Sequence, residues 1–263
     1  MLRMFIASLL SAISLMAHAD LIDTIKEREY LVVGTLPDHP PFAKRNNNNT
    51  VSGYDIDFAS IIANKLGVKL KIQDLDPADR IGAVKSGKVD ILVATFTKTL
   101  EREREVSCSL GYFVSAQKVL TRKGQFQTAE SLANARIGVS KGGTGENTSR
   151  KLYPKASIIT FADIPEASQA LAQSRIDVFM ADEAALVGRL NAMPNKSLYE
   201  ISNYAITTES FAIATKLGEK RLMNLINESL IESEQNGEAT KIFNRWFGPQ
   251  TSTPFPRTFR IQG

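Results

Sequence analysis

The chain has 263 residues, of which 23% are charged, and a formal net charge of +4. Its lysines and arginines are spread along the sequence without a dense basic stripe, so we expect no binding to nucleic acid. It has one cysteine, Cys108, and two histidines, His18 and His39. These are too few for an internal disulfide and leave little for a catalytic triad or a zinc site, so we expect neither a metal nor another cofactor.

Residues 1–19 have the features of a secretory signal peptide. Arg3 gives a positive start, residues 4–16 are mostly apolar, and Ala17-His18-Ala19 has the small-x-small form of a cleavage site. The apolar stretch is shorter than the roughly 20 residues of a membrane-spanning helix, although a short anchor is the alternative. We expect cleavage before Asp20 and a periplasmic mature protein of one or two domains.

The remaining sequence alternates short strands with helices. The first run is a strand at 30–34, a helix at 57–66, a strand at 68–72, a helix beginning at Asp76-Pro77, and a strand at 89–94. The second run is a strand at 136–139, a helix at 146–152, a strand at 158–159, a helix at 163–171, and a strand at 176–180. A strand at 211–214 and helices near 219–235 and 242–247 follow. This order predicts two successive α/β units with parallel sheets.

Three segments could bind a ligand. Ala94-Thr95-Phe96-Thr97 ends a predicted strand, and ligands of open α/β sheets bind at that edge. Arg102 follows closely, and its planar guanidinium suits a carboxylate, although the run at 101–105 is also typical of a solvated charged surface. The glycine-rich turn at 141–146 precedes a helix whose N-terminus favours an anion, unless it is an ordinary flexible turn.

Asp182 is the third candidate, at the end of the strand at 176–180. Its carboxylate could hold an ammonium group, cap the following helix, or do both. Together, Arg102, Thr97 and the Thr144 turn would supply donors for a carboxylate, and Asp182 and carbonyls near Ala94 would supply acceptors for an ammonium group. The sequence therefore predicts a receptor for an α-amino acid zwitterion.

Several segments also occur in the order and spacing of a known family. They are Gly34-Thr35 with Pro40-Pro41-Phe42, Gly53-Tyr54-Asp55-Ile56-Asp57, Ser86-Gly87-Lys88-Val89-Asp90, Thr97 to Glu101-Arg102, Gly143-Thr144-Gly145-Glu146, Arg175-Ile176-Asp177, Asp182 and Arg245-Trp246-Phe247-Gly248. In these segments the chain resembles the polar amino-acid solute-binding proteins (family 3) of bacterial ABC importers. The resemblance covers nearly all of the chain after residue 19.

The resemblance implies the two-lobed α/β fold of type II periplasmic binding proteins, with two parallel-sheet lobes joined by a two-segment hinge. Lobe 1 would comprise 20–113 and 209–263, and lobe 2 would comprise 114–208. It implies a monomer that captures a polar amino acid and delivers it to a membrane permease. Thr97, Arg102 and the Thr144 N–H would hold the ligand carboxylate, and Asp182, with Ala94 and Thr95, would hold its ammonium group.

The ligand's side chain is less well defined by the resemblance. Asp79-Arg80-Ile81 and the segment at 181–186 resemble the glutamate/aspartate-binding subgroup, so Arg80 would meet an acidic side chain, unless it pairs with Asp79 or Asp76 at the surface. Lys141 would reach the distal end of the ligand or lie in solvent. His39 stands where the family usually has an aromatic ring, and would lean over the ligand or serve as a loop residue.

An enzyme on the same fold is the main alternative. Dehydratases that act on prephenate or arogenate resemble these receptors, and they need an acid in the cleft. Glu183 or Glu146 could be that acid, but nothing in the sequence requires one.

Overall fold

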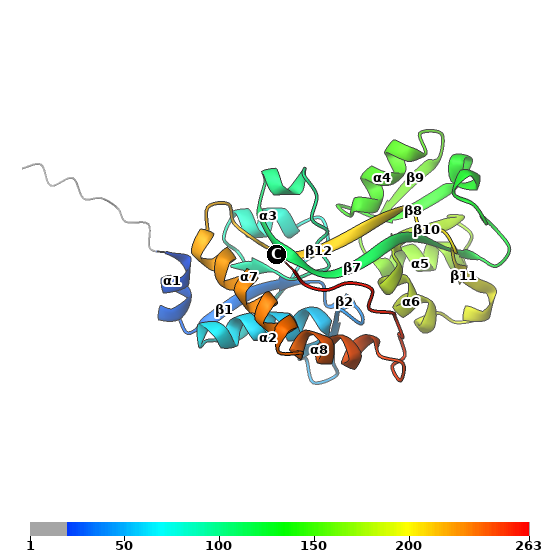
Figure 1. The fold of residues 1–263 in the computed structure, drawn as a ribbon. Coiled ribbons are helices and arrows are strands. Elements are labelled where there is room, and N and C mark those ends of the chain that lie inside the picture. Colours follow the sequence, from blue (N-terminus) through cyan, green and yellow to red (C-terminus); the bar gives the residue numbers. More distant parts are fainter. Residues whose placement is uncertain (1–19, 263) are drawn as a thin grey trace, which may run out of the picture.

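The computed structural model describes residues 20–262 (Figure 1). The predicted signal peptide at 1–19 therefore lies outside the described residues. Within 20–262, no helix combines the length and the apolar character needed to cross a bilayer.

The molecule has two halves joined by two long strands, β7 (Ser107–Arg122) and β12 (Thr207–Thr215) (Figure 1). The first half contains α1 (Leu21–Glu27), β1 (Tyr30–Thr35), α2 (Tyr54–Leu66), β5 (Lys69–Asp74), α3 (Arg80–Lys85), β6 (Ile91–Leu92), α7 (Lys220–Gln235) and α8 (Glu238–Phe247). The second contains β8 (Arg136–Ser140), α4 (Thr144–Leu152), β9 (Ser157–Phe161), α5 (Ile164–Ala172), β10 (Val178–Asp182), α6 (Glu183–Ala192) and β11 (Tyr199–Ile201). This confirms the predicted two-lobed α/β fold.

One sheet runs through both halves in the order β5-β1-β6-β12-β7-β10-β8-β9, and β11 also pairs with β7. The β5-β1-β6 and β10-β8-β9 groups are parallel, as predicted, whereas β7 and β12 are antiparallel to each other and to their outer neighbours. The predicted lobe boundaries lie side by side within this pair, because Val114 pairs with Ser210 and Ser115 with Glu209. The exact division into lobes stays a prediction.

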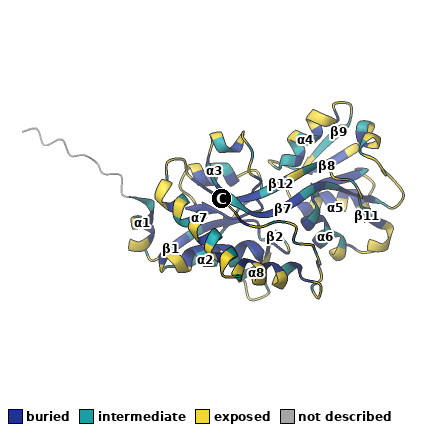
Figure 2. Cartoon of the chain, viewed as in Figure 1, coloured by how far each residue is buried: buried dark blue, intermediate teal, exposed yellow. Residues whose placement is uncertain are grey.

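An aromatic cluster fills the first half and is contributed by distant parts of the sequence. The ring of Phe113 on β7 lies 5.0 Å from those of Phe42 and Phe247 and stacks on Phe211, with Tyr54 also in contact. Figure 2 shows the crossing strands as mostly buried or of intermediate burial, with exposed residues gathered on the outer faces of the helices. The strands that carry the site are therefore fixed from both sides by packing.

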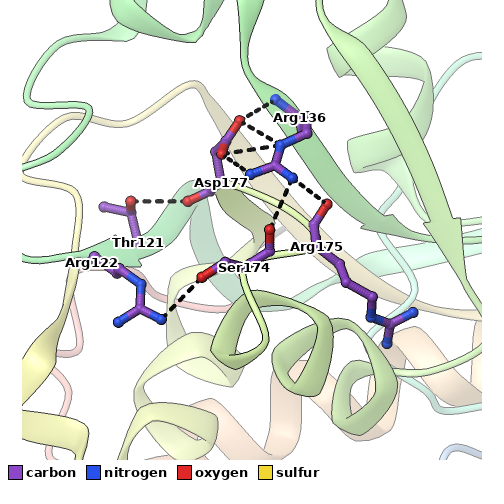
Figure 3. Close-up of polar contacts among 6 residues, drawn as sticks. All are labelled: Thr121, Arg122, Arg136, Ser174, Arg175 and Asp177. Carbon is purple, nitrogen blue, oxygen red and sulfur yellow. Dashed lines mark hydrogen bonds and ion pairs between the residues drawn. The ribbon is translucent and has the colours of Figure 1, made fainter.

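The Arg175-Ile176-Asp177 segment, which carries part of the family resemblance, has a structural role. Asp177 accepts hydrogen bonds from the backbone N–H of Arg136 at 2.8 Å and from its guanidinium, which also donates to the carbonyls of Ser174 and Arg175 (Figure 3). The hydrogen bond from Arg136 lowers the pKa of Asp177. The Arg175 side chain points away from this cluster (Figure 3).

The predicted starts of α2 and α3 were wrong, and hydrogen bonds outside the helical pattern account for both differences. Helix α2 begins at Tyr54 rather than Asp57, because the first N–H groups donate to Pro41 and Phe42 carbonyls. Helix α3 begins at Arg80 rather than at Asp76-Pro77, and the Pro77 carbonyl accepts instead from the Arg80 side chain at 2.9 Å.

A small sheet lies beside the cleft, outside the two alternating α/β runs. It consists of β2 (Asp38–His39), β3 (Ala43–Arg45) and β4 (Val51–Ser52), and the asparagine run at 46–49 forms the turn between β3 and β4. This sheet holds His39 at the edge of the first half that faces the second.

Candidate amino-acid binding cleft

A cavity of about 420 Å³ lies between the two halves. Most of the predicted site residues line it: His39, Arg80, Thr95, Thr97, Arg102, Thr144 and Asp182. Ala94 and Lys141 do not. Ala94 is fully buried behind the wall, and Lys141 is exposed, with its backbone N–H donating to Phe161.

Arg102 lies in the short 3-10 turn Arg102–Arg104 and is only 8% exposed. Its guanidinium stacks over Phe96, 4.3 Å from the ring centroid, and donates to the carbonyls of Thr97 at 2.9 Å and Gly142 at 3.0 Å. Burial lowers its pKa, and the nearby Glu209 acts in the opposite direction. Two of five N–H groups are thus bonded within 20–262, which leaves donors for a carboxylate in the cavity.

Arg80 is also buried, but its guanidinium is held by backbone carbonyls. It donates to Pro77 at 2.9 Å, Ala94 at 3.0 Å and Gly142 at 3.3 Å. Burial and then the like charge of Arg102 lower its pKa to about 9. The suggested surface pairing with Asp79 or Asp76 does not occur in the described structure. Arg80 therefore fixes the wall of the cleft and has fewer donors to offer an acidic ligand than the sequence indicates.

Thr95 and Thr97 follow β6 at the C-terminal edge of the sheet, as predicted. Thr97 forms a bridge with Phe211 on β12, and Thr95 has a left-handed backbone with φ of 44°. The N–H of Thr95 donates to Asp55 at 3.0 Å, which stabilises this uncommon conformation. Both hydroxyl-bearing residues are nearly buried and face the cavity.

The second half contributes the N-terminus of α4, which begins at Thr144 rather than at Glu146. The N–H of Thr144 belongs to the first turn and has no acceptor within the helix, so it can serve an anion. Its hydroxyl is bonded to the carboxylate of Glu209 and accepts from Gln117 at 2.9 Å.

Asp182 lies at the N-terminus of α6, where it forms the helix cap expected of it, and the ammonium-binding role stays a prediction. Its Oδ1 accepts from the N–H of Ala185 at 2.9 Å, which is a helix cap, and its side chain lines the cavity with 8% exposure. Its Oδ2 faces Nε2 of His39, 3.6 Å away in the other half. That nitrogen is buried and has no hydrogen-bond partner among the described residues.

Sequence reasoning missed three polar residues of the site. Glu209 on β12 and Gln117 on β7 line the cavity and are joined by a 2.8 Å hydrogen bond. Asp55 lies behind Thr95 and accepts from the Tyr112 hydroxyl at 2.6 Å. Burial raises the pKa of Glu209 and brings that of Asp55 to about 7. Neither periodicity nor a local pattern distinguishes Glu209 and Gln117 from ordinary polar positions in strands. Asp55 belongs to the segment Gly53-Tyr54-Asp55-Ile56-Asp57 of the family resemblance, but it was given no role in the site.

The acids suggested for an enzyme lie outside the cavity wall. Glu183 pairs with Lys118 at 2.6 Å, and Glu146 pairs with Arg150 at 3.1 Å. Within residues 20–262, no group of three histidine, cysteine, aspartate or glutamate side chains could hold a metal ion.

Comparison with known proteins identifies the family. The model of the bacterial extracellular solute-binding proteins, family 3, matches residues 31–249. The chain belongs to this family.

Similar proteins support the assignment along most of the chain. The ABC transporter glutamine-binding protein of Bacillus subtilis (strain 168) is 32% identical over 233 residues, 86% of this chain and 84% of the relative. The glutamate/aspartate import solute-binding protein of Escherichia coli (strain K12) is 25% identical over 243 residues, 88% of this chain and 80% of the relative. The crystal structure of the ancestral amino acid-binding protein AncCDT-1, a precursor of cyclohexadienyl dehydratase, has a TM-score of 0.80 and 29% identity, covering 87% of this chain and 100% of that one.

These findings give this family 3 protein a solute-binding role in amino-acid transport by an ABC importer. They do not favour the dehydratase alternative, because the family and the curated relatives are solute-binding proteins. They also do not single out the glutamate/aspartate subgroup, since the relative of that name is less similar than the glutamine-binding one.

Proposed function

We propose that the cleft binds an α-amino acid as a zwitterion, with the carboxylate at Arg102 and the N-terminus of α4, and the ammonium group at Asp182. One observation carries this proposal. Arg102 and Asp182 come from opposite halves, are each 8% exposed, and line the same cavity. In so dry a site, charge-assisted hydrogen bonds are strong, and an unmatched ligand charge is costly.

The ligand would act as the bridge that favours the closed form. The charged partners Arg102 and Asp182 come from opposite halves, so only the closed arrangement satisfies both charges of the ligand, and binding shifts the population towards closure. The closed protein, a periplasmic monomer released by cleavage before Asp20, would then present the amino acid to its membrane permease. It is a receptor and not an enzyme in this proposal, since Glu183 and Glu146 lie outside the cavity.

The bound amino acid would have a polar side chain. Three carbonyls engage Arg80, which leaves it only two N–H groups for an acidic side chain, and Lys88, which also lines the cavity, is exposed. We therefore expect neutral polar amino acids such as glutamine to bind at least as well as glutamate or aspartate.

A thermal-shift screen of the mature protein with the common amino acids tests the proposal. A ligand that binds only the folded state raises the free energy of unfolding by about 2.7 kcal/mol at one hundred times its Kd. Calorimetry of the best ligand, with its decarboxylated amine and its deaminated acid as controls, should show that both charged groups are required. If no amino acid raises the melting temperature, the proposed function is wrong.

A further inference from the structure

Two glycines of the second half touch the backbone of the first half with no room for a side chain. Gly142, in the turn between β8 and α4, lies against the turn at 77–79: a Cβ there would lie 2.8 Å from the Cα of Ala78. Gly188, on α6, lies against the loop at 40–41: a Cβ there would lie 2.6 Å from the carbonyl oxygen of Pro40. Ordinary contacts of a Cβ begin near 3.4 Å, so an alanine at either position requires the backbones to separate.

The two contacts lie on opposite sides of the crossing strands. In Figure 1, α3 and α4 lie above β7 and β12, whereas β2 and α6 lie below them. The cavity wall includes Pro77 beside the first contact and His39 beside the second. The two glycine contacts together limit how closely the halves can approach each other on each side of β7 and β12.

The Gly142 contact is also linked to the ligand site. The carbonyl of Gly142 accepts from Arg102 at 3.0 Å and from Arg80 at 3.3 Å, so both guanidinium groups are oriented by the opposite half. A separation of several tenths of an ångström would stretch the Arg80 bond past the usual limit and weaken the Arg102 bond. Arg102, which would bind the ligand carboxylate, would then be held less firmly in its orientation.

We propose that Gly142 and Gly188 are positioning residues that set the closed distance between the two halves, and through it the affinity for the amino acid. This inference rests on the proposed function, because closure must be coupled to ligand binding. The glycines themselves touch no ligand in this scheme. They act by allowing the walls that carry Arg102 and Asp182 to come together.

Each glycine has a matched control elsewhere in the chain. Gly142 has φ of 73° and Gly124 has φ of 76°, but Gly124 has open space around its Cβ position, so both alanine variants suffer the same backbone strain. Gly188 and Gly82 are both helical, and Gly82 also has open space, so both alanine variants gain helix propensity. A difference in ligand affinity or in closure between a variant and its control is therefore due to the contact between the halves.

The experiment measures Kd by calorimetry and the radius of gyration by small-angle X-ray scattering, with and without saturating amino acid. We expect Gly142→Ala and Gly188→Ala each to raise Kd about tenfold or more relative to Gly124→Ala and Gly82→Ala, since overpacking is destabilising. With ligand at saturation, both should keep a larger radius of gyration than their controls. Without ligand, each variant should have the same melting temperature as its control. A variant that merely disturbed the fold would instead melt at a lower temperature than its control.

The outcomes separate this inference from the proposed function. Wild-type protein that neither binds nor contracts with any amino acid would overturn both. Wild-type protein that binds and contracts, with Gly142→Ala and Gly188→Ala matching their controls in Kd and radius of gyration, would overturn only the role of the glycines.

Discussion

Oδ2 of Asp182 faces Nε2 of His39 across the cleft at 3.6 Å, while Oδ1 of the same carboxylate caps α6. The cap fixes the orientation of the carboxylate, so its second oxygen is directed at the opposite half. Because the helix terminus fixes the carboxylate and its Oδ2 remains an acceptor in the cavity, Asp182 is well placed to bind an ammonium group.

Replacing Asp182 with asparagine should separate these two roles. Asparagine caps helices as well as aspartate does, so the melting temperature without ligand should change little. The ligand's ammonium group would lose its charged partner in a buried site, and we expect Kd to rise about a hundredfold, from a loss of about 3 kcal/mol. Calorimetry at neutral pH measures this, and an unchanged Kd would exclude Asp182 as the ammonium site.

Replacing Arg102 with lysine keeps the charge but removes the planar donor group. The variant cannot reach Thr97, Gly142 and a ligand carboxylate together, so we expect Kd to rise about tenfold to a hundredfold. Arg104→Lys is the control, because Arg104 is exposed in the same turn. Equal affinities for the two variants would show that Arg102 contributes only its charge or does not touch the ligand.

The buried carboxyl group of Asp55 should make stability depend on pH. Burial raises its pKa from 3.8 to about 7, against hydrogen bonds from Tyr112 and Thr95 that lower it. Between these values the folded state binds more protons than the unfolded state, so the free energy of unfolding should fall as the pH rises from about 4 to 7. The slope from this group is at most about 1.4 kcal/mol per pH unit.

Urea unfolding at several pH values tests this expectation. Asp55→Asn should remove this part of the slope, whereas Tyr112→Phe removes a bond that lowers the pKa and should extend the fall to higher pH. The interpretation fails if wild type and Asp55→Asn show parallel profiles from pH 4 to pH 7.

Cys108 should be slow to react with thiol reagents in the folded protein. It is half-buried, and burial, reinforced by Glu103, raises the pKa of its thiol to about 11. Little thiolate is therefore present at neutral pH. Modification by a disulfide reagent at pH 8 should be much faster in urea than in buffer; comparable rates in both would show that burial does not suppress the reactivity of Cys108.

The sequence predicts the order of the elements and the edge of the sheet that carries the site. Strands such as 136–139 and 176–180 are recognisable because they are continuously apolar between turns, and the residues that follow them must lie at one edge. Thr97, Arg102, Thr144 and Asp182 do line one cavity in the structure, and their binding roles stay predictions.

The features of the site that the sequence does not predict depend on contacts between distant segments. Gln117 and Glu209 are polar residues inside strands, and they are buried only because β7 and β12 cross between the halves. The engagement of Arg80 by the Gly142 carbonyl likewise requires the two halves to meet. Such positions have no local periodicity, so their role was not predictable from the sequence.

The aromatic cluster of the first half has a consequence for how the protein is made. Phe113 packs against Phe243 and Phe247 of α8, and these residues are synthesised after every strand of the second half. Until then a growing chain has most of the second half but an unfinished core in the first. We therefore expect the two halves to fold in sequence, with the first half becoming compact after the second.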